Sequence, residues 1–353
     1  MTRLKDIAER AGVSISTASR AISGDTSRPV SEDTKQKVRQ IALELGYEIT
    51  ESPVKSSKSI PKKNANLLQI ACIGPQHLIY NHPYFTRVFD GIHHKMKEMG
   101  LPAPIIRTSE EVDDAAKMKA LVQEHDIQGV LAVSWYDESL YQVLRKENVH
   151  VLGVSINDDK LNVPVVDCDR VYASRAGVRH LIDQGHTRIG FIGGPSFSKT
   201  MDSEERFVGY KFAMLDADLR INPSWMINSQ WNVNRSYRKM GDMLKNLPRN
   251  EWPTAMFCAS DMLAIPAMRA ALEQECRIPD DLAFMGMDNI EMAQYTTPPL
   301  TSVQVPRFEI GMMAAKSIVD YLEGHYPAPP KILLPCSIIV RESSLYSRLV
   351  TTG

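Results

Sequence analysis

From residue 67 onward the sequence alternates between short apolar runs and longer amphipathic segments, which restricts the folds open to it. The apolar runs predict buried parallel strands at 67–74, 103–108, 129–134, 150–154, 188–194, 255–260 and 282–287. The segments between them predict helices at 84–100, 110–125, 137–147, 170–185, 200–219, 234–247, 261–276 and 306–323. This order predicts an α/β fold with doubly wound parallel sheets, and the stretch is long enough for two of them.

Residues 1–47 have a different pattern, that of three short helices. Apolar residues recur at helical spacing in three groups: Leu4, Ile7, Ala8 and Ala11; Ala18, Ala21 and Ile22; and Val38, Ile41, Ala42 and Leu45. Gly12 interrupts the pattern between the first two groups, and Ser14 follows as an N-cap. Two helices joined by a tight glycine turn predict a helix-turn-helix module.

The second of these helices presents a polar face whose chemistry suits DNA. Its outward residues are Ile15, Ser16, Thr17, Ser19 and Arg20. An arginine can bond two acceptors on a guanine edge, an isoleucine can touch a thymine methyl, and hydroxyls can reach phosphate or base. The alternative is that small hydroxyl residues crowd this helix only because it is exposed to solvent.

Charge is distributed unevenly along the chain. Residues 1–63 contain 12 Lys and Arg against 8 Asp and Glu, whereas the remainder contains 29 against 34. Residues 48–66 are rich in Ser, Pro and Lys and read as a linker, whose lysines can contact phosphates. A basic N-terminal module on a mildly acidic body suggests that the module meets a polyanion.

Composition argues against several other classes. No apolar run approaches the length of a membrane span, and the N-terminus has no hydrophobic signal region, so we expect a cytoplasmic protein without membrane contact. The five cysteines have no CxxC spacing, which indicates neither a disulfide framework nor a zinc site. The sequence lacks a Walker loop, a Rossmann fingerprint, an HExxH motif and a GxSxG elbow. We therefore expect no metal, no cofactor and no catalytic residues.

The first 47 residues carry a resemblance to a known family. LKDIAERAGVSISTASRAISG and VSEDTKQKVRQIALELGY resemble the N-terminal headpiece of the lactose repressor/galactose repressor family of bacterial transcription regulators. The resemblance implies that Ile15, Ser16 and Arg20 read bases and that Ser14, Thr17 and Ser19 lie at or near phosphates. It also implies a homodimer on a pseudopalindromic operator. The linker departs from the family, because it has no leucine to wedge into the minor groove.

The body, residues 67–345, resembles the periplasmic-binding-protein-like core of the same family. The resemblance implies two lobes, between which the chain crosses near 164, 300 and 326, with a small sugar effector in the cleft. Residues 346–353 form a C-terminal tail without leucine heptads, which favours a dimer.

Residues at the ends of the predicted strands are the candidates for binding an effector. Arg206 matches the family position that clamps effector hydroxyls, and Asp288 matches its acidic effector residue; the alternatives are a local ion pair for Arg206 and a helix N-cap for Asp288. Ser260 lies at the strand-to-helix turn ASD, followed by Asp261 as an expected helix N-cap. The remaining candidates, each of which can instead belong to the core or the surface, are Tyr84, Phe85, Trp135, Asn157, Trp231 and Arg307.

These features predict a sugar-responsive transcriptional repressor. Because NHPYF (81–85) occurs together with ASD (259–261) and the hinge leucine is missing, the resemblance extends to regulators of galactoside utilisation. The first alternative is a solute-binding protein that delivers sugar to a transporter. A sugar-modifying enzyme on the same kind of scaffold is another alternative, since fold alone does not decide function.

Overall fold

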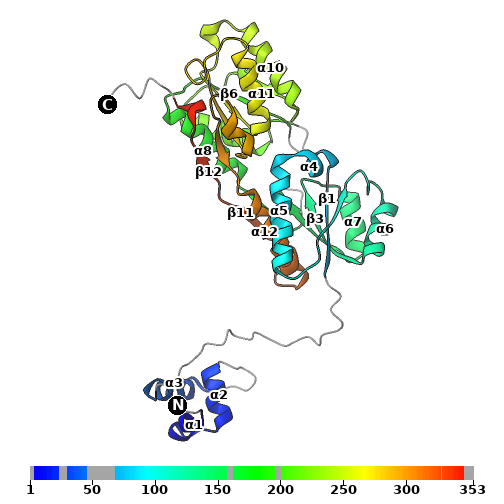
Figure 1. The fold of residues 1–353 in the computed structure, drawn as a ribbon, viewed down its shortest axis with the longest axis vertical. Helices are drawn as coiled ribbons and strands as arrows, with labels where there is room; N and C mark the ends of the chain where they lie inside the picture. The colour runs from blue at the N-terminus through cyan, green and yellow to red at the C-terminus, as the bar shows by residue number, and fades with distance from the viewer. Residues whose placement is uncertain are drawn as a thin grey trace. The chain divides into compact units, whose positions relative to one another are not determined.

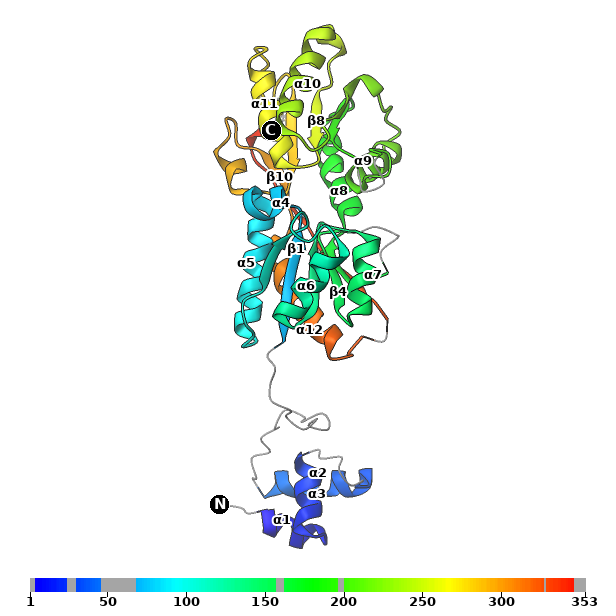
Figure 2. The ribbon, with the colours of Figure 1, turned by 90° about the vertical axis from the view of Figure 1, so that its right-hand side faces the viewer.

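The computed structural model describes residues 4–23, 30–45, 68–156, 162–195, 200–326 and 328–345. The chain divides into two compact units, Met1–Asn66 and Leu67–Gly353 (Figure 1). The first contains the three helices α1 (Leu4–Ala11), α2 (Ile15–Ser23) and α3 (Glu32–Glu44). The second is built from two lobes, each with its own sheet (Figure 2).

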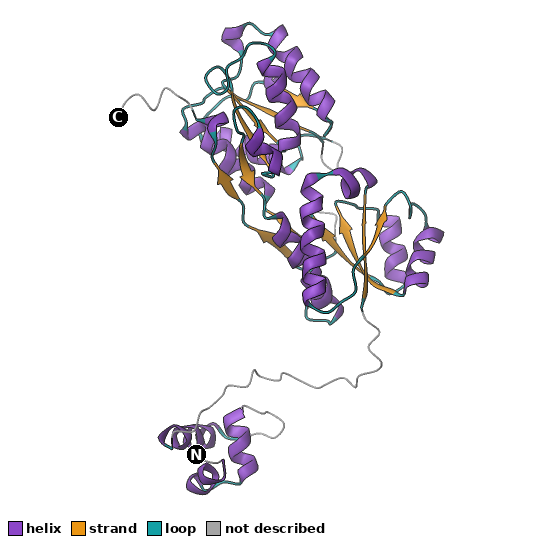
Figure 3. Ribbon diagram, viewed as in Figure 1, coloured by secondary structure: helices purple, strands orange, loops and turns teal. Residues whose placement is uncertain are grey.

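Lobe 1 is built on a six-stranded parallel sheet in the order β11-β5-β4-β3-β1-β2. Its strands are β1 (Gln69–Gly74), β2 (Ile105–Thr108), β3 (Ile127–Val133), β4 (His150–Val154), β5 (Val165–Cys168) and β11 (Lys331–Leu334). One face is covered by α5 (Pro83–Glu98) and α12 (Arg307–Leu322), and the other by α6 (Ala115–His125) and α7 (Glu138–Lys146) (Figure 3). The short helix α4 (Gln76–Asn81) precedes α5.

Lobe 2 has a second six-stranded sheet in the order β12-β10-β9-β8-β6-β7, parallel except for β12 against β10. Its strands are β6 (Ile189–Gly193), β7 (Met226–Asn228), β8 (Ala255–Cys258), β9 (Ala283–Met287), β10 (Thr301–Gln304) and β12 (Ser337–Ile339). The pair α8 (Arg170–Asp183) and α9 (Glu205–Asp216) packs on one face, and the pair α10 (Val233–Asn246) and α11 (Asp261–Leu272) on the other. Four short 3-10 helices complete the core: η1 (Pro223–Trp225), η2 (Arg249–Glu251), η3 (Glu291–Tyr295) and η4 (Glu342–Ser344).

The chain crosses between the lobes three times: between β5 and α8, between β10 and α12, and between β11 and β12. These crossings come later in the sequence than the expected 164, 300 and 326. The reason is that residues 165–168, 301–304 and 331–334 each add a strand to a sheet before the chain leaves it. Neither lobe is a contiguous piece of sequence.

Two glycines let α5 and α12 approach each other closely on lobe 1. A Cβ atom on Gly91 would lie 2.0 Å from the carbonyl oxygen of Phe308, and one on Gly311 would lie 2.0 Å from the carbonyl oxygen of Val88. No side chain fits at either position, so the two backbones can touch only because both residues are glycine. This contact fixes the N-terminal ends of both helices, which carry candidate effector residues, at one end of lobe 1 (Figure 1).

The doubly wound α/β fold predicted from the sequence is confirmed, with several corrections to its elements. The helix expected over 110–125 begins only at Ala115, because Asp114 caps it by accepting hydrogen bonds from the backbone N–H groups of Ala116 and Lys117. The helix expected over 200–219 spans Glu205–Asp216. No helix of the described residues is long and apolar enough to cross a membrane. The linker 48–66 and the tail 346–353 lie outside the described residues.

Candidate functional site

The three helices of the first unit enclose a small apolar core. Its buried residues are Ile7, Ala8, Ala11, Ala18, Ala21, Val38, Ile41 and Ala42, with Val13, Val30 and Leu45 packed against them. Gly12 has a φ of +71°, which an L-residue adopts only with strain, so it makes the tight turn from α1 into α2. The predicted helix-turn-helix arrangement is therefore present, and α2 turns its polar residues outward.

The start of α2 is held by a network of hydroxyl groups. The Ser14 hydroxyl oxygen accepts from the backbone N–H of Thr17 at 3.1 Å, the geometry of an N-cap. The same oxygen lies 2.9 Å from the Ser16 hydroxyl and 2.8 Å from the Thr17 hydroxyl. Ile15, the first residue of α2, is 49% exposed. The first turn thus presents one apolar group among fixed hydroxyls.

Arg20 lies folded along the same helix. Its Nε donates to the Ser16 carbonyl at 3.0 Å, and one terminal nitrogen donates to the Thr17 hydroxyl at 3.5 Å. Both contacts are made within α2 itself, and a guanidinium can exchange them for a guanine edge. Ser19, half-exposed, lies on the same helix. Ser14, Ile15, Ser16, Thr17, Ser19 and Arg20 therefore belong to one turn-and-helix surface, and their roles on DNA remain predictions.

In the core, Arg206 lies in the first turn of α9. Glu204 caps this helix by accepting from the backbone N–H groups of Arg206 and Phe207, and its carboxylate also accepts from the Arg206 guanidinium at 2.5 Å. The Arg206 guanidinium carbon lies 4.9 Å from the centre of the Trp231 ring, and its buried Nε has no hydrogen-bond partner among the described residues. The local ion pair holds this arginine in place but leaves one donor unused.

Asp288 follows β9 in a constrained backbone conformation. Its φ is +105° and that of Asn289 is +47°, and its side chain is 3% exposed. Burial raises the pKa of Asp288 to about 6. Three guanidinium groups lie near enough to oppose that rise: those of Arg206, Arg307 and Arg170. A buried carboxylate without an ion-pair partner among the described residues is able to accept hydrogen bonds from a ligand.

The ASD turn differs from the sequence prediction. Ser260, not Asp261, is the N-cap residue of α11, and its hydroxyl makes no capping hydrogen bond. Asp261 is inside the helix and fully buried, where its carboxylate accepts from the backbone N–H of Ile290 at 2.8 Å and from the Ser302 hydroxyl at 2.6 Å. Asp261 therefore holds the loop that presents Asp288, and burial raises its pKa well above the usual range.

Arg307 and Tyr84 approach Arg206 and Asp288 from lobe 1, and we call these four residues and their charged neighbours the cluster. Arg307 is the first residue of α12 and donates to the carbonyl of Asn289 in lobe 2 at 2.8 Å. Tyr84, in the first turn of α5, is buried and shares a 3.1 Å hydrogen bond with the Ser155 hydroxyl at the end of β4. Burial, followed by nearby cationic groups that include Arg206 and Arg307, lowers the pKa of the α5 N-cap His82 to about 4.

Two other predicted residues, Phe85 and Trp135, are packed among apolar side chains. Phe85, in the first turn of α5, is buried in the apolar core of lobe 1, with its ring centre 4.8 Å from that of Tyr84. The Trp135 ring packs against Tyr141 at 5.4 Å in the layer under α6 and α7. Asn157 lies outside the described residues. Trp231 is 39% exposed and reaches the cluster only through Arg206, while its indole N–H donates to the Pro195 carbonyl at 2.8 Å.

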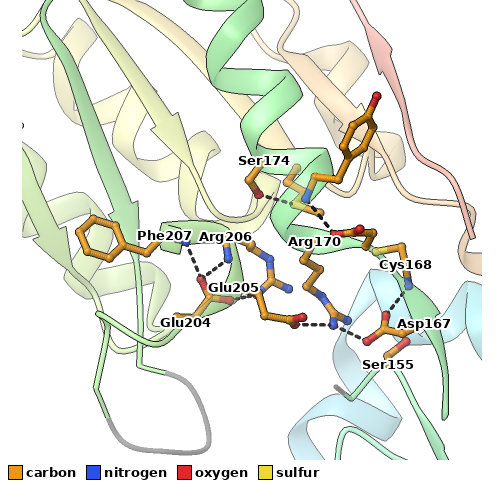
Figure 4. Close-up of polar contacts among 12 residues, drawn as sticks. Ser155, Asp167, Cys168, Arg170, Ser174, Glu204, Glu205, Arg206 and Phe207 are labelled. Atoms are coloured by element: carbon orange, nitrogen blue, oxygen red, sulfur yellow. Dashed lines mark hydrogen bonds and ion pairs between the residues drawn. The ribbon is translucent and has the colours of Figure 1, made fainter. Parts of the chain in front are cut away.

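Two further charged residues of the cluster were missed by the sequence analysis. Arg170, the first residue of α8, donates to the carboxylates of Asp167 and Glu205, the latter at 3.3 Å (Figure 4). Asp167 is fully buried and Arg170 is 6% exposed. The only sequence signal was an acidic and a basic residue three positions apart directly after an apolar run, a pattern that is also common on solvated surfaces.

The chain combines an exposed helix-turn-helix surface with a two-lobed core that has charged residues at its strand ends. These features define the class of DNA-binding regulators with a periplasmic-binding-protein-like core. Residues 3–48 match the family of bacterial regulatory proteins, lacI family, and residues 178–344 match the periplasmic binding protein-like domain. The chain belongs to the lacI family of bacterial transcriptional regulators.

Curated relatives match this chain over nearly its whole length. The chain is 28% identical to the transcriptional regulator DegA of Bacillus subtilis, across 97% of this chain and 98% of that protein. It is 29% identical to the ribose operon repressor of Haemophilus influenzae, across 98% and 99%. The transcriptional repressor CytR of Escherichia coli is 28% identical, across 97% and 96%.

Solved structures show the same fold. The complex of the transcriptional regulator CelR with cellobiose superposes with a TM-score of 0.69 at 25% identity, covering 97% of this chain and 100% of that one. The lac repressor dimer bound to operator and an anti-inducer gives a TM-score of 0.68 at 22% identity, covering 98% and 99%. At that identity the second likeness supports the fold alone.

Proposed function

We propose that this protein is a repressor of carbohydrate-utilisation genes that binds a pseudopalindromic operator in the cytoplasm as a homodimer and changes its operator affinity when a small sugar binds the core. Galactosides are the first class of effector to test. In this proposal the protein needs no cofactor and catalyses no reaction.

One observation carries the proposal: a single chain combines an exposed DNA-suited surface on α2 with a cluster of charged side chains at the strand ends of both lobes. A DNA-binding protein without an effector would not need buried, partly unpaired polar groups there. The relatives support a sugar as the effector, since one is named a ribose operon repressor and one solved regulator holds cellobiose. NHPYF and ASD favour a galactoside within that class.

The chemistry of the cluster suits a polyhydroxylated ligand. The Asp288 carboxylate can accept from two hydroxyl groups, and the unused Nε donor of Arg206 can donate to a third. Trp231 and Tyr84 offer aromatic faces or edges nearby. A ligand held by residues of both lobes binds one relative orientation of the lobes more tightly than others, and it shifts operator affinity by that difference.

The test is operator binding by fluorescence anisotropy at fixed salt, with the protein's own upstream region and an unrelated duplex of equal length. The panel contains galactose, lactose, allolactose, glucose, ribose and cellobiose. A specific complex weakened by one galactoside is the expected result. A specific complex that no sugar changes would reject the effector class, and equal affinity for both duplexes would reject the regulator itself.

A further inference from the structure

A buried series of charged side chains joins the two lobes at the first crossing (Figure 4). Asp167 belongs to β5 of lobe 1, whereas Arg170 begins α8 of lobe 2. One terminal nitrogen of Arg170 donates to both Asp167 and Glu205, so it lies between carboxylates of the two lobes. The other Asp167 oxygen accepts from the backbone N–H of Cys168 at 2.8 Å. Both ends of this bridge are therefore fixed to secondary structure.

The far end of the bridge is the turn that presents Arg206. Glu205 is the first residue of α9, directly between its N-cap Glu204 and Arg206. Glu204 accepts from the backbone N–H and the guanidinium of Arg206, so the position of this turn determines where the Arg206 side chain lies. Arg170 thus anchors the turn from outside α9, through a contact with lobe 1.

The environment makes this bridge strong. Arg170 is 6% exposed, and the side chain of Glu205 is 22% exposed. Charge-assisted hydrogen bonds shielded from water are stronger than those on a surface. A second arginine on the same helix provides a contrast: Arg175 pairs with Asp216 of α9 at 2.6 Å, but these side chains are 51% and 36% exposed and both belong to lobe 2.

We infer that Arg170 is a positioning residue for the effector response, because it ties the turn that carries Arg206 to lobe 1 and so sets the affinity for the effector. The inference rests on the proposed function, in which Arg206 contacts the sugar. It adds a residue that does not itself need to touch the ligand.

Two variants remove the bridge without leaving a buried charge unpaired. Glu205→Gln breaks the ion pair with α9 and leaves Asp167 and Arg170 together. The double variant Asp167→Asn with Arg170→Gln replaces both buried charges by amides that can still bond each other. Arg175→Gln is the matched control, since it breaks the exposed ion pair between the same two helices.

Two measurements test the inference. Sugar affinity by calorimetry should fall about tenfold in both bridge variants and stay unchanged in the control, while operator affinity without sugar stays unchanged in all three. Amide hydrogen exchange of residues 204–208, measured without sugar, should be faster in the bridge variants alone.

Unchanged exchange in folded variants would overturn the inference, whether or not any sugar binds. Faster exchange with unaltered sugar affinity would also overturn the inference, because the position of the turn would then not determine the affinity for the effector. A wild-type protein that binds no sugar would reject the proposed function separately, and the exchange rates would still decide whether Arg170 holds the turn.

Discussion

The DNA-binding surface of α2 and the charged cluster of the core are built in opposite ways. On α2 every side-chain hydrogen bond among the described residues spans four residues or fewer, and the groups are exposed or half-exposed. In the core the groups come from α5, β5, α8, α9, β9 and α12, and they are largely buried. The surface is thus a property of one helix, whereas the cluster exists only when both sheets have formed.

This difference indicates how substitutions should affect each function. A side chain of the α2 surface can be removed with little effect on the rest of the molecule, because few contacts depend on it. A side chain of the cluster is held by several elements, so its removal alters their packing and charge balance. Separate loss of the two functions is the clearest test of the comparison.

Arg20→Ala should give the largest difference between the change in operator affinity and the change in sugar affinity. We expect operator affinity to fall about 100-fold, because a bidentate contact to guanine contributes about 1–3 kcal/mol and phosphate attraction is lost with it. Sugar affinity should not change. Anisotropy and calorimetry on the same preparation measure both quantities, with Arg10→Ala, at an exposed arginine of α1, as the control. Normal operator affinity in Arg20→Ala would show that α2 does not face the bases.

Asp288→Asn should produce the reverse pattern. The amide keeps the shape of the side chain but loses a charged acceptor, so sugar affinity should drop about 30-fold. Operator affinity without sugar should stay within twofold of the wild type. Calorimetric titration with the best sugar of the panel gives the result, and Asp281→Asn, at a carboxylate paired with Arg277 elsewhere in lobe 2, is the control. Equal losses in both variants would mean that the effect is general destabilisation.

The effect of pH on sugar affinity should be somewhat smaller than the effect of Asp288→Asn. Because the Asp288 pKa is raised to about 6, the carboxylate that accepts hydroxyl groups is lost as pH falls through that value. Affinity should therefore be nearly constant above pH 7 and about tenfold lower at pH 5. His82, whose pKa is lowered to about 4, stays neutral across this range. A flat profile between pH 5 and 7 would exclude Asp288 as the accepting group, and Asp288→Asn should have such a profile.

Ser14→Ala should have the smallest effect. Loss of an N-cap costs about 1 kcal/mol, so the thermal transition of the helical N-terminal unit should shift down slightly and operator affinity should fall about fivefold. Far-UV circular dichroism follows the transition. Ser19→Ala, on the same helix but past its first turn, is the control and should leave the transition unchanged. A larger loss for Ser19→Ala would assign the hydroxyl contact with DNA to that residue instead.

Sequence patterns predicted the local features well for a physical reason. Helical spacing at Ile7, Ala8 and Ala11 and the turn at Gly12 depend on neighbours a few residues away, so the N-terminal module could be derived directly. The buried strands of both sheets are continuous apolar runs, so they can also be recognised from their own residues. Four-residue strands such as β5 and β11 have too little pattern to stand out.

The cluster could be predicted only in part. Arg206 and Asp288 follow strands whose ends meet at one edge of a sheet, and the resemblance singled out both. Trp135 also follows the end of a strand, yet its ring turns into the apolar layer, because side-chain direction depends on packing partners. Arg170 acquires its role from Glu205, 35 residues further along the chain, and nothing in the local sequence encodes that contact.

The triple crossing has a consequence for synthesis of the chain. During translation the face of the lobe 1 sheet that packs against α5 stays half-covered until α12, residues 307–322, has emerged, and the free edge of β5 stays open until β11 follows at 331–334. The last strand of lobe 2 comes a few residues later still. A ribosome that stalls between β10 (301–304) and β11 (331–334) therefore holds two unfinished sheets with exposed edges, which are templates for aggregation.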